Sequence, residues 1–196
     1  MRRGEARPLD LANYLRLRAG ELAEVWSMEV SARDHGPGSQ FDQVVSRFMY
    51  QLADLLPWLM GPHGPHVRPL WDRTAELFGV MAAKRGLAAG EVIEEFQILR
   101  ELLIRMLFEH PLAEGSLSLR DILRLNRIID SGVTHASVGH TDAMFFQFFE
   151  PPENQESKTP EEIVREAERQ LALVAEELPQ VVEVTPPESV AEVLGN

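Results

Sequence analysis

The chain has 196 residues, of which 44% are hydrophobic, so one domain, or one domain with a tail, can bury a sizeable core. It contains no cysteine, which excludes disulfides, thiol chemistry, cysteine zinc sites and iron–sulfur clusters. The formal net charge is −12, and the stretch from Glu150 onward, with 12 acidic and 3 basic residues, carries most of it. Because phosphate neutralisation requires a basic surface, we expect no nucleic-acid partner.

The start of the chain and its longest apolar runs indicate whether the protein is secreted or inserted in a membrane. No apolar run approaches the roughly 18–20 residues that span a bilayer. The first ten residues, MRRGEARPLD, hold no apolar signal-peptide core. We therefore expect a soluble, cytoplasmic protein with no membrane partner.

Apolar residues recur with helical spacing, and the first helices are expected over residues 9–32 and 40–56, the second ending at Pro57. Residues 57–69 contain four prolines and two glycines and predict a solvated loop. His63 and His66 lie in that loop, but two histidines without a third ligand are a weak case for a metal site. A third helix is expected over residues 67–85, with Gly86 as the residue that ends it.

The helix expected over residues 88–110 organises the rest of the chain. Its apolar positions step by four and three, the period of one buried face: Val92, Phe96, Leu99, Leu103 and Met106. Glu95 and Arg100 fall at the edges of this face. They are either ordinary flanking charges or a partly buried, paired set, since an unpaired buried charge is very costly.

The next helix is expected to be long, over residues 119–149, with Ser118 and Asp121 at its start in capping-box style. It carries a stripe of small residues with helical spacing: Gly132, Ala136, Gly139 and Ala143. Such a stripe favours the close approach of another backbone, from the same chain or from a second subunit, although a kinked helix would also fit. His140 lies on a second, mainly apolar stripe of this helix, with Ile129, Val133 and Met144. It and His135 are either packed histidines or candidate ligands for haem or another small molecule.

A linker begins after residue 150, and a helix is expected over about 160–178, ending before Pro179. This divides the chain into a helical domain, residues 1–150, and residues 151–196 with the linker, the helix and an acidic tail. The helix carries a heptad-like apolar stripe: Ile163, Ala167, Leu171, Val174 and Leu178. This stripe either packs on the domain or binds a groove on a partner. The tail is disordered or a docking peptide.

Enzyme signatures are missing from the sequence. There is no glycine-rich phosphate loop, no G-x-S-x-G elbow, no kinase signature, no H-E-x-x-H and no E-x-x-H pair. We therefore expect no catalytic residues, no metal site and no cofactor, apart from the haem or tetrapyrrole alternative at His140 or His135.

Short motifs in this chain resemble the N-terminal sensor domain of the RsbT co-antagonist (RsbRD) type, found in stressosome proteins and in bacterial sensor histidine kinases. The motif residues are Arg85-Gly86, Glu95-Phe96, Leu99-Arg100, Asn126 and Asp130, and Trp26 suits the tryptophan of the first helix. The resemblance covers about residues 9–149. It implies an all-helical, globin-like or bundle domain that dimerises and passes a signal to a downstream module.

Together the residues and the resemblance predict an all-α, antiparallel bundle of four to five helices followed by an amphipathic helix and a tail. We expect an Arg100–Asp130 bridge to be buried between neighbouring helices, with Asn126 completing the network. The expected function is that of a non-catalytic signalling regulator, a homodimer that binds a protein partner. The alternative is a sensor that binds a small molecule or haem in the bundle. The chain could also be a fragment of a longer kinase.

Overall fold

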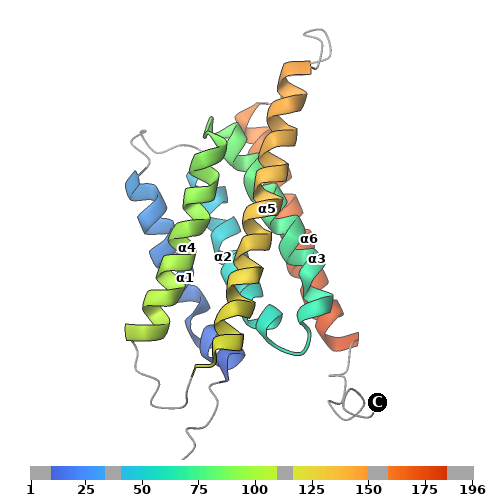
Figure 1. Cartoon of the computed structure of the whole chain (residues 1–196). Coiled ribbons are helices and arrows are strands. Elements are labelled where there is room, and N and C mark those ends of the chain that lie inside the picture. Colours follow the sequence, from blue (N-terminus) through green and yellow to red (C-terminus); the bar gives the residue numbers. More distant parts are fainter. Residues whose placement is uncertain (1–9, 34–40, 110–116, 150–158, 185–196) are drawn as a thin grey trace, which may run out of the picture.

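The computed structural model describes residues 10–33, 41–109, 117–149 and 159–184. Over these residues the chain forms helices and no strand, which confirms the predicted all-α bundle (Figure 1). The helices are α1 (Leu11–Arg33), α2 (Asp42–Met60), α3 (Gly64–Lys84), α4 (Ala89–Glu109), α5 (Leu119–Phe149) and α6 (Pro160–Val184). None of them is long and apolar enough to cross a bilayer.

Large aromatic side chains fill the centre of the bundle. Trp26 of α1, Phe78 of α3 and Phe96 of α4 are at most 1% exposed, and their ring centroids lie 5.6 to 6.0 Å apart. Tilted and edge-on contacts at this distance are favourable for aromatic rings beyond the area they bury. The core therefore joins helices from the first half of the chain around α4.

The predicted loop over residues 57–69 is wrong. α2 continues through Pro57 to Met60, and α3 begins at Gly64 and contains Pro69. Pro57 lies in the last turn of α2, where a proline removes only one helical bond, and the Gly61 amide donates to the Pro57 carbonyl at 3.1 Å. His63 directly precedes α3, and its ring packs edge-on against that of Trp58.

Gly86 ends α3 as the sequence predicts. Its φ is +82°, in the left-handed region that favours glycine. The Gly86 amide donates to the Ala83 carbonyl at 3.0 Å, and the Leu87 amide donates to the Ala82 carbonyl at 3.1 Å. These two bonds form a Schellman motif, which turns the chain sharply into α4.

α5 packs most extensively on α3 of the same chain. A Cβ added at Gly139 would lie 2.0 Å from the Glu76 carbonyl oxygen, and one added at Gly79 of α3 would lie 1.8 Å from the Ala136 carbonyl oxygen. Gly132 faces the rings of Phe96 and Trp71. The backbone that approaches this small-residue stripe therefore belongs to α3. Ala143, the last member of the stripe, is half-buried.

α6 covers α2 and α3, and its apolar stripe belongs to the core. Ala167, Leu171, Val174 and Leu178 are at most 9% exposed, and Ile163 packs against them. The use of this stripe as a free partner-binding face is therefore wrong. The expected end before Pro179 is wrong as well, since α6 continues to Val184. Residues 150–158 and 185–196, the predicted linker and tail, lie outside the described residues.

Candidate functional site

Of the ion pairs among the described residues, the most deeply buried joins Arg85, at the end of α3, to Glu95 in the second turn of α4. Arg85 Nη1 donates to Glu95 Oε1 at 2.8 Å, and the two side chains are only 6% and 7% exposed. The Trp26 indole N–H donates to the Glu95 backbone carbonyl at 2.8 Å. Sequence reasoning identified Glu95 but missed Arg85 as its partner. The pair fixes α1, α3 and α4 to one another, which is a structural task.

Arg100 of α4 and Asp130 of α5 are bonded, but their bridge is not buried. The Arg100 side chain is 25% exposed and that of Asp130 is 63% exposed. Asn126 donates to the Ile122 carbonyl of its own helix at 3.1 Å and so is not shown to complete the pair. The predicted buried network is wrong because Asp130 lies toward the outer side of α5. Surface pairs of this kind contribute about 0–1 kcal/mol.

His140 is a packed histidine. It is 5% exposed, and its Nε2 lies 2.7 Å from the Leu87 carbonyl oxygen. A carbonyl oxygen can only accept, so Nε2 carries a proton and is engaged in this bond. His140 therefore ties α5 to the α3–α4 turn.

His135 lies at the surface between α5 and α3. Its Nε2 is 3.6 Å from Asp72 Oδ2, and its Nδ1 is 4.0 Å from Glu76 Oε2. The Ser131 hydroxyl donates to Asp72 Oδ1 at 2.8 Å. Nevertheless, no group of three or more histidine and carboxylate side chains within the described ranges has the arrangement of a metal site.

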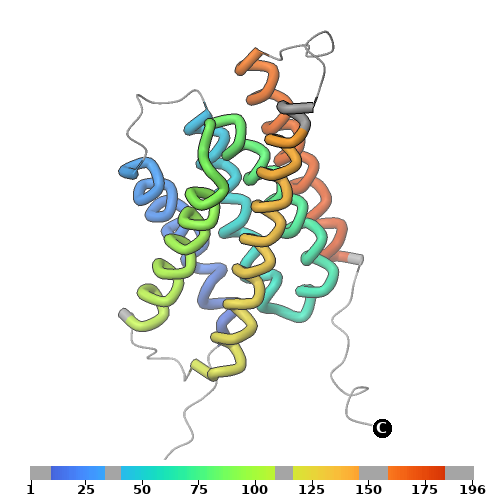
Figure 2. Tube along the Cα trace, turned by 45° about the horizontal axis from the view of Figure 1, so that its top comes forward, coloured from blue at the N-terminus to red at the C-terminus, as the bar shows by residue number. Residues whose placement is uncertain are grey.

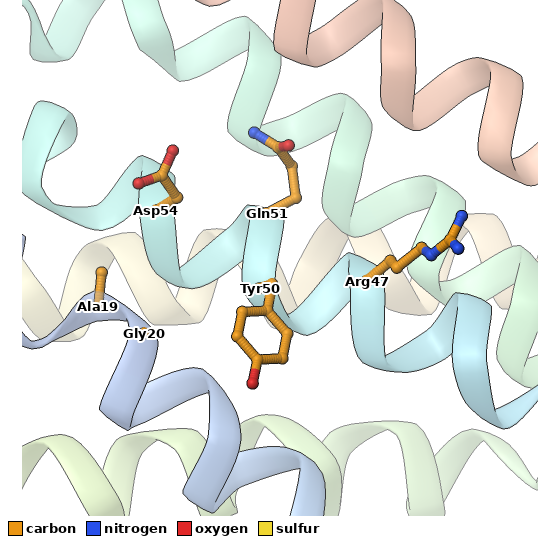
Figure 3. Close-up of a pocket in the computed structure, with 6 residues that line it drawn as sticks. All are labelled: Ala19, Gly20, Arg47, Tyr50, Gln51 and Asp54. Atoms are coloured by element: carbon orange, nitrogen blue, oxygen red, sulfur yellow. The ribbon is translucent and has the colours of Figure 1, made fainter.

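A depression of about 330 Å³ lies between α1 and α2. Figure 3 shows that Gln51 and Asp54 point to one side of α2 while Tyr50 points to the other. Arg47 bonds Glu168 of α6 at 2.5 Å. The polar groups of this depression therefore do not converge on one point, as they would in a specific ligand site.

Asp54, in the same depression, titrates abnormally. Partial burial of its carboxyl raises the pKa above 3.8, although the residue as a whole is exposed, and the nearby charge of Arg16 opposes this shift. Removal of a carboxyl from water disfavours its charged form. This is a local cost to the fold and not by itself a catalytic feature.

Two further depressions, of about 500 and 710 Å³, lie at the start of α5. Arg124 lines both, and its guanidinium donates to the Leu59 carbonyl at 2.8 Å and to the Gly61 carbonyl at 3.2 Å. These carbonyls lie at the C-terminal end of α2, where a cation is favourable. Arg124 thus caps α2, while Arg120 and Arg127 are exposed beside it.

The most distinctive surface feature is an apolar face formed by α4 and α5, which run antiparallel side by side (Figures 1 and 2). Of the eleven large hydrophobic side chains exposed among the described residues, seven lie on these two helices. We call them the α4–α5 face: Ile93, Ile104, Phe108, Leu119, Leu123, Val138 and Phe145, which are 37% to 71% exposed. Large exposed apolar side chains that gather on two neighbouring helices make a candidate interaction surface.

No family model, curated protein or solved structure matches this chain. Its function must therefore be inferred from its own residues.

The α4–α5 face was not identified from the sequence. Residues such as Ile93, Ile104 and Phe108 fall outside the stripe that α4 buries, so the helix is apolar on more than one side. A large apolar residue outside the buried stripe of an amphipathic helix stays in water unless another surface covers it. That excess of apolar positions was the available signal.

Proposed function

We propose that this chain is a non-catalytic regulator of bacterial signalling, a helical sensor-like domain of the cytoplasm that acts as a homodimer and through contacts with a protein partner. The observation that carries the proposal is the α4–α5 face. Burial of its large apolar side chains against another surface lowers the free energy by roughly 25 cal/mol per Å² of apolar area. A protein whose task is to be bound would present such a face.

The motif residues give a second line of support. Among the residues behind the RsbRD-type resemblance are two bonded pairs. Arg100 bonds Asp130 across α4 and α5, and Arg85 forms the buried ion pair with Glu95. Gly86 adopts the positive φ that makes the turn between them. The short motifs thus describe a physical unit that sets the angle between α3, α4 and α5. This supports a sensor-type domain in which α4 and α5 transmit a signal by their packing.

The described polar groups support a binding role rather than a catalytic one. Arg85, Glu95, Arg124 and His140 are each engaged in holding helices together. In the alternative, a haem or small-molecule sensor, His140 or His135 would serve as a ligand. The Leu87 bond to His140 competes with that task, so we propose the binding role as the function.

Light scattering on the purified chain, with an absorption spectrum of the same sample, tests the proposal. We expect twice the chain mass of 22.1 kDa and no band in the visible region. A mass of one chain at every concentration would contradict the homodimer. A visible band would instead support the tetrapyrrole alternative.

A further inference from the structure

α6 shows how a segment from the later part of this chain docks on the bundle. Its apolar stripe packs against the core beside α2 and α3. Arg73 of α3 donates to Glu177 at 2.8 Å, and Arg47 of α2 donates to Glu168 at 2.5 Å. α6 therefore combines apolar contacts with carboxylate–arginine pairs at their edge.

The sequence pattern that begins α6 occurs again directly after α6. The Thr159 amide donates to Glu162 Oε2 at 2.7 Å, and the Glu162 amide donates to the Thr159 hydroxyl at 3.3 Å, which is a capping box. The pattern Thr-Pro-x-Glu stands at residues 159–162 and again at residues 185–188. We call residues 185–194 the tail segment. Its apolar residues have helical spacing: Val190, Val193 and Leu194.

The first turns of α5 have the complementary chemistry. They line the depression of about 710 Å³. Leu119 and Leu123 expose apolar side chains there, and Arg120 and Arg127 are exposed beside them. This part of the surface therefore offers apolar contacts next to two guanidinium groups.

The carboxylates near these arginines are engaged elsewhere. Asp121 accepts from a hydroxyl in the cap of its own helix. Glu101 and Asp130 each accept from an arginine of α4. Within the described ranges, neither Arg120 nor Arg127 takes part in an ion pair. Both are thus available to a carboxylate that comes from outside these ranges.

The tail segment starts at the right end of the bundle to reach this surface. α6 ends at the end of the bundle at which α5 begins (Figure 1), and α3 packs against both helices. Because neighbouring helix axes are about 8–10 Å apart, α5 lies within about 20 Å of α6 across α3. An extended chain advances about 3.3 Å per residue, so about six residues cover that distance. The later half of the tail segment can therefore reach the first turns of α5.

We propose that the tail segment binds the start of α5 in its own chain, with its glutamates beside Arg120 and Arg127 and its apolar side chains on Leu119 and Leu123. Charge favours this occupant, because the segment carries two carboxylates and no basic residue. The bound segment covers one end of the α4–α5 face, so a partner has to displace it there. This regulatory consequence rests on the proposed function, whereas the docking itself does not.

The absence of cysteine from the sequence makes the docking testable in the full chain. We would combine Val193→Cys with Leu123→Cys and treat the dilute protein with a short thiol crosslinker. The matched control combines Val193→Cys with Val138→Cys, which is exposed on the same helix about 22 Å further along. Mass spectrometry of the denatured product distinguishes a crosslink within one chain from one between chains. We expect at least tenfold more crosslink within one chain from the first pair than from the control.

A charge exchange tests the contacts with the arginines. Arg120→Glu with Arg127→Glu, added to the first cysteine pair, should lower its yield at least fivefold, because like charges then face each other. Glu188→Arg with Glu192→Arg in the same chain should restore the yield, since the attraction returns with the signs exchanged. A loss caused by damage to the fold would not be restored in this way. Circular dichroism of each variant shows that the fold is retained.

Equal yields from the first pair and the control would overturn the docking and leave the depression to a separate partner molecule. A crosslink that joins two chains would assign the site to the tail of a second copy and would overturn docking within the chain. A yield that the charge exchange does not change would overturn the contacts with the arginines. None of these results depends on the mass of the unmodified protein, so they are separate from the test of the homodimer.

Discussion

At the residue scale, Arg85 and Glu95 form a buried ion pair on which the stability of the fold depends. Both side chains are almost fully removed from water, and each compensates the charge of the other. The sequence placed a charge, Glu95, at the edge of the buried face of α4. It could not show that the partner lies ten residues earlier, because the φ of Gly86 and the Schellman motif bring Arg85 back to α4.

We predict that Glu95→Gln or Arg85→Ala lowers the free energy of unfolding by roughly 3–5 kcal/mol, because each leaves a buried charge uncompensated. Arg100→Ala, which breaks the more exposed bridge to Asp130, should lower it by no more than about 1 kcal/mol. Urea unfolding followed by circular dichroism measures both. Equal losses in the two cases would contradict this assignment of the buried pair.

Asp54 supplies a pH-dependent prediction. Its pKa is raised in the folded state, so the folded chain binds the proton more tightly than the unfolded chain does. The protonated Asp54 carboxyl therefore contributes to the free energy of unfolding. This contribution is complete below the unfolded pKa of about 3.8 and is lost as the pH rises through the folded pKa. We therefore expect Asp54→Asn to be at least as stable as the parent at pH 7. Urea unfolding of both proteins over a range of pH measures this, and the difference in stability between Asp54→Asn and the parent should disappear at acidic pH.

At the element scale, the sequence predicted the helices better than the connections between them. α5 begins at Leu119 as predicted, because the Ser118 hydroxyl accepts from the Asp121 amide at 3.1 Å. Prolines caused the errors. Pro57, Pro69 and Pro179 all lie within helices, where tertiary packing outweighs the lost backbone bond. A local pattern does not reveal such compensation.

The contact between α3 and α5 depends on two glycines that allow the backbones to touch. We predict that Gly79→Ala and Gly139→Ala each lower the free energy of unfolding by about 1–3 kcal/mol, since the new methyl group would overlap a carbonyl oxygen. At Gly20 of α1 an added methyl group would meet no atom within 4 Å, so Gly20→Ala should be neutral or stabilising by up to about 1 kcal/mol. Thermal unfolding of the three variants compares them directly, and a stabilising effect at Gly139 would contradict the close approach.

α6 offers a test of its place in the core. Val174 is fully buried against α2 and α3, whereas the adjacent Ala175 is exposed. We predict that Val174→Glu lowers the free energy of unfolding by more than about 2 kcal/mol, because it would bury an unpaired charge. Ala175→Glu should change it by less than about 0.5 kcal/mol. If both variants unfold like the parent in urea, α6 does not pack on the bundle.

At the scale of the whole molecule, the described residues combine a filled aromatic core with an apolar face on α4 and α5 that is exposed among them. Composition predicted a sizeable core, and the spacing of apolar residues placed Phe96 on a buried face of its helix. Apolar positions outside the buried stripe of α4 were a signal for the second feature, but which of them are exposed depends on how α4 and α5 are rotated against their neighbours. That rotation is set by contacts such as Gly132 against Phe96, which only the folded chain defines.

The most direct test of the central claim is the solution mass, by light scattering, of a chain with two charges placed on the α4–α5 face. Ile104→Glu with Leu123→Glu should give a folded protein of 22.1 kDa, while the parent and the control pair Leu17→Glu with Met28→Glu, on exposed positions of α1, give twice that mass. The exposed positions leave the core unchanged, so circular dichroism and unfolding should match the parent. A double variant that keeps the mass of the parent dimer would contradict the α4–α5 face as the surface through which this protein acts.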